Sequence, residues 1–159
     1  MPLKRLLILY DSISGNTERM AKFIAEGAQN KNLQVVIKKI KESSEQDLIE
    51  ADAIAFGCPT YNRDLTSNTK KFFETEIAKI KKHLKGKIGA AFGSYGWSAE
   101  ALELMKEMMK YLKMNVLELP QEFTGVPDED FYITSLSDIK QRSEKFGEDL
   151  AKKIKTSKK

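Results

Sequence analysis

The 159-residue chain is poor in the residues that build metal sites and covalent cross-links. It has one cysteine, Cys58, and one histidine, His83, which excludes an internal disulfide and a cluster of Cys and His metal ligands. Its apolar runs are far shorter than a membrane span, and residues 3–10 are too short for the core of a signal peptide. These absences favour a cytoplasmic protein without a bound metal ion or a membrane anchor.

The remaining composition is typical of a soluble globular protein, with 41% hydrophobic and 31% charged residues. The length fits a single domain over residues 1–159, of which we expect about residues 156–159 to be a frayed tail. The formal net charge is +4, and many of the lysines lie in residues 79–87 and 152–159. Such clusters indicate either solvated surfaces or docking to an acidic protein. They lack the interleaved aromatics of a nucleic-acid site.

Short apolar runs alternate with longer amphipathic stretches along the chain. We expect strands at residues 3–10, 33–40, 51–57, 87–93 and 116–119, and helices at 15–30, 66–85, 98–113 and 135–155. Ser44 and Asp47 form a capping-box pattern that predicts a further short helix. This alternation predicts an α/β fold with a doubly wound, five-stranded parallel sheet and helices on both faces.

Residues 10–17, Tyr-Asp-Ser-Ile-Ser-Gly-Asn-Thr, carry the strongest local signal. They join an apolar run to a helical pattern and contain three hydroxyl side chains, Ser12, Ser14 and Thr17. A helix N-terminus behind such a turn presents free backbone N–H groups and a partial positive charge, which suit a phosphate. The same residue types also occur in plain helix caps. Because the segment contains no Lys or Arg, a phosphate here would be held by neutral groups.

Two further polar loops follow the third and fourth predicted strands. They are residues 59–64 (Pro-Thr-Tyr-Asn-Arg-Asp) and residues 94–98 (Ser-Tyr-Gly-Trp-Ser). With the strand order 2-1-3-4-5, all three loops would meet at the carboxyl edge of the sheet, where ligands of such sheets bind. Flat aromatic side chains there suit a flat heteroaromatic ligand. The simpler alternative is that Tyr95 and Trp97 only cover the end of the sheet.

With these loops the sequence resembles the flavodoxins, in particular the flavodoxin domain of the A-type flavoproteins (flavodiiron proteins). The matching segments are residues 8–12, 15–21, 57–60 and 92–98. The resemblance spans nearly the whole chain. It implies a flavodoxin-like fold, in a stand-alone short chain, and flavin mononucleotide (FMN) as the cofactor.

The resemblance also implies roles for individual residues. The FMN phosphate would be bound by Ser12, Ser14, Gly15, Asn16 and Thr17, with the backbone N–H of Ile13. One side of the isoalloxazine ring would be lined by Thr60, Tyr61 and Asn62, with their neighbours Pro59 and Arg63. The other side would be lined by Ser94, Tyr95, Gly96 and Trp97. No catalytic acid, base or nucleophile is expected.

This chain departs from the family pattern in charge and in the second loop. Flavodoxins are commonly acidic, whereas this chain is basic. In flavodoxins a peptide near Tyr61 and Asn62 can turn over when the flavin is reduced, and this loop has no glycine there. Asn62 still allows such a turn, because asparagine tolerates positive φ better than most residues.

We therefore expect an electron carrier that shuttles electrons between redox partner proteins, with acidic partners favoured by the basic charge. Arg63 is either a plain surface charge or a candidate contact for such a partner. The alternative is an FMN-dependent NAD(P)H:quinone-type oxidoreductase, disfavoured because few residues separate Asn62 from the next helix. A receiver domain is excluded because Gly57 and Cys58 stand where its phosphorylated aspartate would be. A P-loop NTPase is excluded because no Gly-Lys-Ser/Thr motif follows the first strand. We expect a monomer or weak dimer without nucleic-acid or membrane partners.

Overall fold

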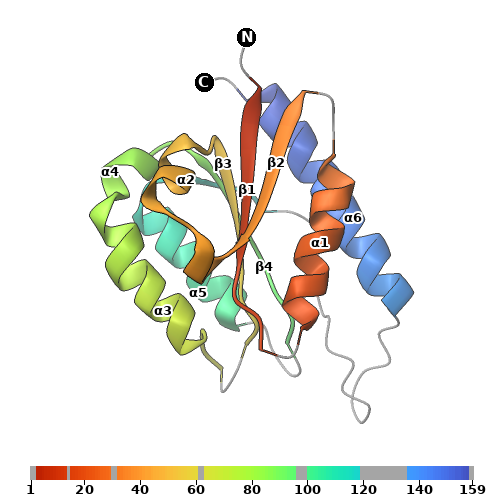
Figure 1. Cartoon of the computed structure of the whole chain (residues 1–159), viewed down its shortest axis with the longest axis horizontal. Helices are drawn as coiled ribbons and strands as arrows, with labels where there is room; N and C mark the ends of the chain where they lie inside the picture. The colour runs from red at the N-terminus through yellow and green to blue at the C-terminus, as the bar shows by residue number, and fades with distance from the viewer. Residues whose placement is uncertain are drawn as a thin grey trace.

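The computed structural model describes residues 3–13, 15–29, 32–60, 63–95, 100–118 and 136–157. Within these residues the chain forms a five-stranded parallel sheet in the order β2-β1-β3-β4-β5 (Figure 1). The strands are β1 (Lys4–Tyr10), β2 (Leu33–Lys39), β3 (Ala53–Gly57), β4 (Ile88–Phe92) and β5 (Asn115–Val116). The predicted fold class and strand order are therefore confirmed.

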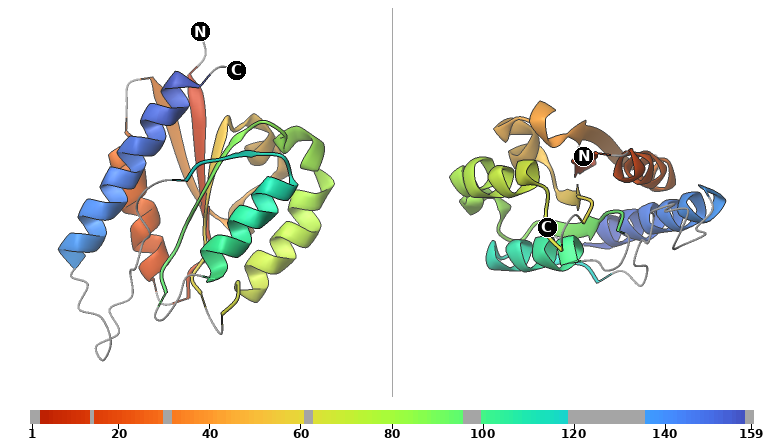
Figure 2. Two further views of the ribbon diagram at one scale, coloured as in Figure 1. Left: turned by 180° about the vertical axis from the view of Figure 1, so that it is seen from behind. Right: turned by 90° about the horizontal axis from the view of Figure 1, so that it is seen from below.

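Helices cover both faces of this sheet, as Figure 2 shows. One face carries α1 (Asn16–Ala28) and α6 (Leu136–Thr156). The other carries α2 (Glu45–Glu50), α3 (Ser67–Phe72), α4 (Lys81–Leu84) and α5 (Glu100–Tyr111). Every residue of β3 and β4 is buried, because strands covered on both faces are removed from water. The small and apolar composition of these two strands follows from that position.

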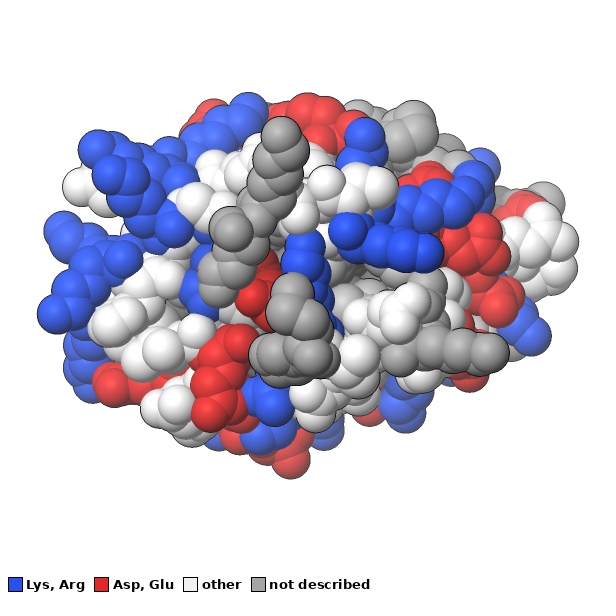
Figure 3. All heavy atoms as spheres, turned by 90° about the horizontal axis from the view of Figure 1, so that it is seen from above, with Lys and Arg blue, Asp and Glu red and all other residues white. Residues whose placement is uncertain are grey.

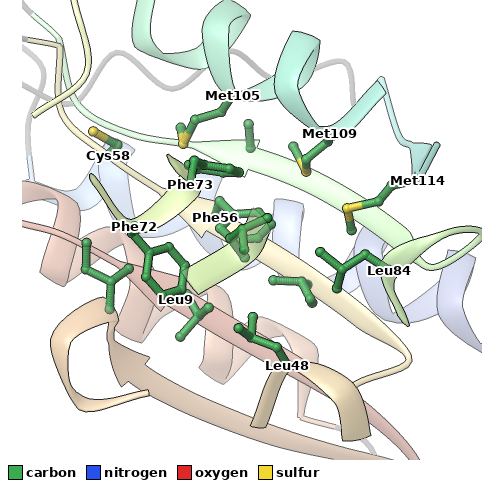
Figure 4. Close-up of a cluster of buried hydrophobic side chains, with 14 of the residues drawn as sticks. Leu9, Leu48, Phe56, Cys58, Phe72, Phe73, Leu84, Met105, Met109 and Met114 are labelled. Atoms are coloured by element: carbon green, nitrogen blue, oxygen red, sulfur yellow. The ribbon is translucent and has the colours of Figure 1, made fainter. Parts of the chain in front are cut away.

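The larger part of the core lies between the sheet and the second group of helices. Figure 4 shows the Phe56 and Phe73 rings at its centre, with Met105 and Met109 of α5 on one side. The two rings pack at a tilt with their centroids 5.0 Å apart, a geometry that aromatic quadrupoles favour. On the opposite face, Phe146 of α6 packs edge-on against Phe92 of β4.

Two predicted elements differ from the structure. The helix expected over residues 66–85 is interrupted, because a π-helical segment over Phe73–Ile77 follows α3 and Ile80 leaves helical geometry before α4. The fifth strand, expected at residues 116–119, is Asn115–Val116. Its position is set by pairing, since Asn115 faces Ile88 and Val116 faces Gly89 of β4. The predicted capping box of Ser44 and Asp47 is present at α2.

The parallel topology gives the two edges of the sheet different characters. All strands run in one direction and the helices return antiparallel to them, so the helix C-termini gather at the amino edge, where the chain ends also lie (Figure 1). The three polar loops lie at the opposite, carboxyl edge. Among the described helices, none is both long enough and apolar enough to cross a membrane.

Candidate functional site

The carboxyl ends of β1, β3 and β4 lie side by side and launch the three loops predicted from the sequence. Tyr10 of β1 is in register with Gly57 of β3, and Gly57 is in register with Phe92 of β4. Backbone hydrogen bonds extend this register beyond the strands, from Asp11 N to Gly57 O at 3.0 Å and from Cys58 N to Phe92 O at 3.1 Å. The first loop (residues 11–15), second loop (58–66) and third loop (93–99) therefore start from one edge.

Buried polar side chains concentrate at this edge. Six are found among the described residues, and five of them lie here: Asn16, Thr17, Thr66, Thr69 and Ser94. The sixth, Ser143, lies in α6. Polar groups are costly to bury unless hydrogen bonds satisfy them. Their concentration at a single edge distinguishes it from the apolar remainder of the interior.

The first loop does not have the geometry of an ordinary helix cap. The residue before α1 is Gly15, with φ +95° and no capping side chain. Ser12 Oγ instead accepts hydrogen bonds from the backbone N–H groups of Gly15, at 3.1 Å, and of Glu18, at 3.4 Å. Few residues other than glycine adopt such a φ readily, and a Cβ at Gly15 would meet open space. The loop thus bends sharply and leaves room outside the start of α1.

Hydrogen bonds join one residue from the start of α1 to one from each of the other two loops. The hydroxyls of Thr17 and Ser94 lie 3.1 Å apart, and Ser94 N donates to Thr17 Oγ1 at 3.4 Å. Thr60 N donates to Ser94 O at 3.0 Å. Thr60 Oγ1 in turn accepts from Ala101 N of α5 at 3.2 Å. Three predicted site residues, Thr17, Thr60 and Ser94, are therefore held together as one unit.

The second and third loops also meet through a close backbone contact. A Cβ on Gly93 would lie 2.0 Å from the carbonyl oxygen of Cys58, so only glycine fits between these loops. Tyr95 is half-buried and packs against the core. Arg63 is exposed and adopts φ +61°, a left-handed conformation that non-glycine residues adopt uncommonly. The second loop thus contains a positive φ one residue after Asn62.

A polar network that the sequence analysis missed lies beneath the loops. Thr66, the N-cap of α3, donates from Oγ1 to Asp11 Oδ2 at 2.6 Å, and its hydroxyl lies 2.8 Å from that of Thr69. Thr66 N donates to Cys58 Sγ at 3.5 Å. Burial raises the pKa of the Cys58 thiol, as is usual for an unreactive cysteine in apolar surroundings. The network fixes the first loop against the start of α3.

A cavity of about 440 Å³ opens beside the first loop, toward β2. It is lined from the first loop by Asp11, Ser12 and Gly15, from the last residue of β2 by Lys39, and from the 3-10 turn that follows β2 by Lys41. Both lysines lie outside residues 10–17, so the local sequence pattern does not reveal them. The predicted strand order contained the signal, because it places the end of β2 next to the end of β1. An anion in this cavity would therefore lie near two lysines, and near the carboxylates of Asp11 and Glu18 that also line it.

Ten of the fifteen predicted site residues lie in the described part of the chain. They are Ser12, Ile13, Gly15, Asn16, Thr17, Pro59, Thr60, Arg63, Ser94 and Tyr95. The other five, Ser14, Tyr61, Asn62, Gly96 and Trp97, lie outside the described residues. The side chain of Ile13 is 66% exposed, which agrees with an expected contribution through its backbone only. Among the described residues no cluster of His, Cys, Asp or Glu could hold a metal ion.

Comparison with known proteins identifies relatives of this chain. Residues 8–155 match the family model described as Flavodoxin. The type A flavoprotein fprA of Rhodobacter capsulatus is 39% identical over 120 residues, which cover 72% of this chain and 27% of that protein. The flavodoxin of Aquifex aeolicus is 34% identical over 93 residues, covering 58% of this chain and 50% of that protein. The chain thus spans about a quarter to a half of these two relatives.

Among solved structures, a flavodoxin from the domain Archaea superposes with a TM-score of 0.82 at 34% identity, covering 95% of this chain and 99% of that one. The family match extends over most of the sequence, and the shared fold places the polar loops of β1, β3 and β4 at one edge. The chain therefore belongs to the flavodoxin family.

Proposed function

We propose that this chain binds FMN at the carboxyl edge of its sheet and carries electrons between redox partner proteins. Proteins of the flavodoxin family bind FMN. The main support is the set of hydrogen bonds that joins Thr17, Thr60 and Ser94, because it holds the start of α1 and the second and third loops together. FMN supplies the redox chemistry when bound, and the protein positions it and tunes its potentials.

The first loop fits the phosphate of this cofactor. The first N–H groups of a helix have no partner within it, and the space outside Gly15 is open. In this proposal Ser12, Ser14, Gly15, Asn16 and Thr17 bind the phosphate together with the backbone N–H of Ile13. The lysines beside the cavity, Lys39 and Lys41, add a positive potential without entering the loop.

The second and third loops bind the ring on its two sides. One side of the ring is lined by Pro59, Thr60, Tyr61, Asn62 and Arg63. The other side is lined by Ser94, Tyr95, Gly96 and Trp97. The hydrogen bond between Thr60 and Ser94 supports this arrangement by holding the roots of the two loops together. The positive φ of Arg63 supports a turn in the second loop that can change its peptide orientation.

The basic net charge of +4 supports acidic redox partners, which would approach the exposed Arg63 at the cofactor edge. The chain would work as a single flavodoxin-like domain over residues 1–159, as a monomer or weak dimer. A cytoplasmic location is supported by the single, buried cysteine. The alternative of an NAD(P)H:quinone-type oxidoreductase is less favoured, because the family match is to electron-carrying flavodoxins.

Stepwise anaerobic reduction of the FMN-loaded protein tests the electron-carrier proposal. We expect two separable one-electron steps in the visible spectrum, with potentials that differ from those of free FMN. Reduction of the bound flavin by NADPH within seconds would instead support the oxidoreductase alternative. Failure to retain FMN through gel filtration would contradict both.

A further inference from the structure

The amino edge of the sheet, opposite to the candidate cofactor site, carries a cluster of lysines. Lys4 Nζ donates to the carbonyl oxygens of Ile154 and Ser157 at 2.9 and 2.7 Å. Lys87 Nζ donates to Ile49 O at 2.7 Å. Both side chains thus stabilise the negative C-terminal ends of helices that gather at this edge.

Four further lysines lie at the same edge of the sheet. The side chains of Lys81, Lys82, Lys85 and Lys113 are exposed, and none forms an ion pair with a described residue. A backbone hydrogen bond from Gly86 N to Lys113 O, 2.9 Å long, holds two of the lysine-bearing turns together. Figure 3 shows Lys and Arg side chains concentrated on the α4 side of this face. We call Lys81, Lys82, Lys85 and Lys113 the amino-edge patch.

The patch borders a cleft of about 510 Å³. Lys4, Lys85 and Lys87 line this cleft, with Asp52 as its acidic member. Tyr111 lies two residues before Lys113, at the end of α5, and its side chain is 80% exposed. Tyrosine is enriched in protein–protein interfaces, and a concave basic surface with one exposed aromatic side chain suits an extended acidic segment.

We propose that the amino-edge patch docks an acidic segment of a partner protein. The charge excess supports an anionic partner. A single exposed tyrosine gives no series of stacking platforms for single-stranded nucleic acid. The exposed α4 segment, Lys-Lys-His, offers no apolar face for insertion into a lipid surface. An acidic protein segment is therefore the partner that the patch fits.

The position of the patch determines whether a docked partner covers the proposed cofactor site. β1 contains seven residues, so at roughly 3.3 Å per residue the two edges of the sheet lie about 20 Å apart. A segment bound at the amino edge therefore leaves the carboxyl edge open. The contact holds a partner without covering the cofactor, and a second protein can approach the flavin at the same time.

Charge-reversal variants of the FMN-loaded protein test this docking with poly-L-glutamate as the probe. The patch variant is Lys81→Glu, Lys82→Glu and Lys85→Glu. The matched control is Lys71→Glu, Lys140→Glu and Lys145→Glu, which has the same net charge but changes exposed lysines of α3 and α6. Binding is measured at low and at physiological salt, with and without FMN. If charge reversal unfolds the patch variant, the corresponding glutamine variant replaces it.

We expect the patch variant to bind poly-L-glutamate roughly tenfold more weakly than the control, from the loss of three exposed ion pairs. We expect binding to weaken with salt and to be the same with and without FMN. Equal loss in both variants, or competition between FMN and poly-L-glutamate, would overturn the proposal. Tighter binding to poly-uridylate or to phosphatidylserine vesicles would overturn the assigned partner class. Failure to bind FMN would contradict the proposed function, but poly-L-glutamate binding could still be measured and would still test the docking proposal.

Discussion

The Thr66 hydroxyl donates to the Asp11 carboxylate across 2.6 Å and joins the end of β1 to the N-terminus of α3. Asp11 is the first residue of the loop proposed to bind a phosphate, where a free carboxylate would repel the ligand. The hydrogen bond holds this carboxylate toward the positive end of the helix that begins at Ser67, where an anion is stabilised. The Asp11 side chain therefore supports the first loop, and the hydrogen bond holds its carboxylate away from a phosphate that it would repel.

Removing this hydroxyl should weaken both the fold and the cofactor site. Thr66→Val removes the N-cap of α3 and the charged hydrogen bond to Asp11, and we expect a loss of about 2 to 3 kcal/mol in the free energy of unfolding. FMN affinity should fall as well. Thr66→Ser retains the hydroxyl and should behave like the wild type in urea unfolding and FMN titration. A Thr66→Val protein that is as stable as the wild type would contradict this role of the hydroxyl.

The lysines beside the first loop should strengthen binding of the phosphate. We expect Lys39→Met with Lys41→Met to weaken FMN binding by about threefold to tenfold at low salt, and less at high salt. Lys71→Met with Lys145→Met is the matched control. Riboflavin, which lacks the phosphate, separates the two causes. If riboflavin affinity falls by the same factor as FMN affinity, the lysines do not act on the phosphate.

Ser143 should be replaceable with a gain in stability. Its side chain is fully buried in α6, and its Oγ has no hydrogen-bond partner among the described residues. An unsatisfied buried hydroxyl costs free energy, so Ser143→Ala should raise the free energy of unfolding by about 1 kcal/mol. Ser143→Cys, whose side chain is of similar size, should have a free energy of unfolding between those of the wild type and Ser143→Ala. A Ser143→Ala protein less stable than the wild type would show that the hydroxyl has a partner.

Protonation of Asp47 should account for part of the fall in the free energy of unfolding at acidic pH. A hydrogen bond from Lys38 holds the pKa of this carboxyl below its ordinary value of 3.8. The unfolded chain therefore takes up the proton first as the pH falls. The stabilisation from the Asp47 carboxylate is fully present above pH 3.8 and disappears as the pH falls through the pKa of this group in the folded protein. Urea unfolding between about pH 5 and 3 should show a shallower loss for Asp47→Asn. Glu107→Gln on α5, the control, should follow the wild-type curve.

The strand order and the edge of the sheet that carries the three polar loops were predictable from the sequence. The alternation of apolar and amphipathic segments defines the layers, and the loops after β1, β3 and β4 carry their polar residues in contiguous runs. The position of Lys39 and Lys41 was also accessible, because β2 adjoins β1 in the predicted order. The composition of the loop itself does not reveal it, because both lysines belong to the neighbouring segment of the chain.

Other features depend on packing that no local pattern contains. The bond between Asp11 and Thr66 joins residues 55 positions apart and requires a particular direction for each side chain. The interruption of the predicted helix at Phe73–Ile77 accompanies the packing of the Phe72 and Phe73 rings, although the amphipathic pattern there is continuous. Periodicity reports which face is buried, but not the local geometry that fits the face to its neighbours.

The single tryptophan allows the central claim to be measured directly. Trp97 is the only tryptophan of the chain and is proposed to lie against the flavin ring, so its fluorescence reports on FMN bound at this site. A titration of the apoprotein with FMN should show saturable quenching at one FMN per chain, abolished in Thr17→Glu, which places a negative charge beside the phosphate. Absence of FMN binding, or stoichiometric binding that leaves the Trp97 emission unchanged, would contradict the account.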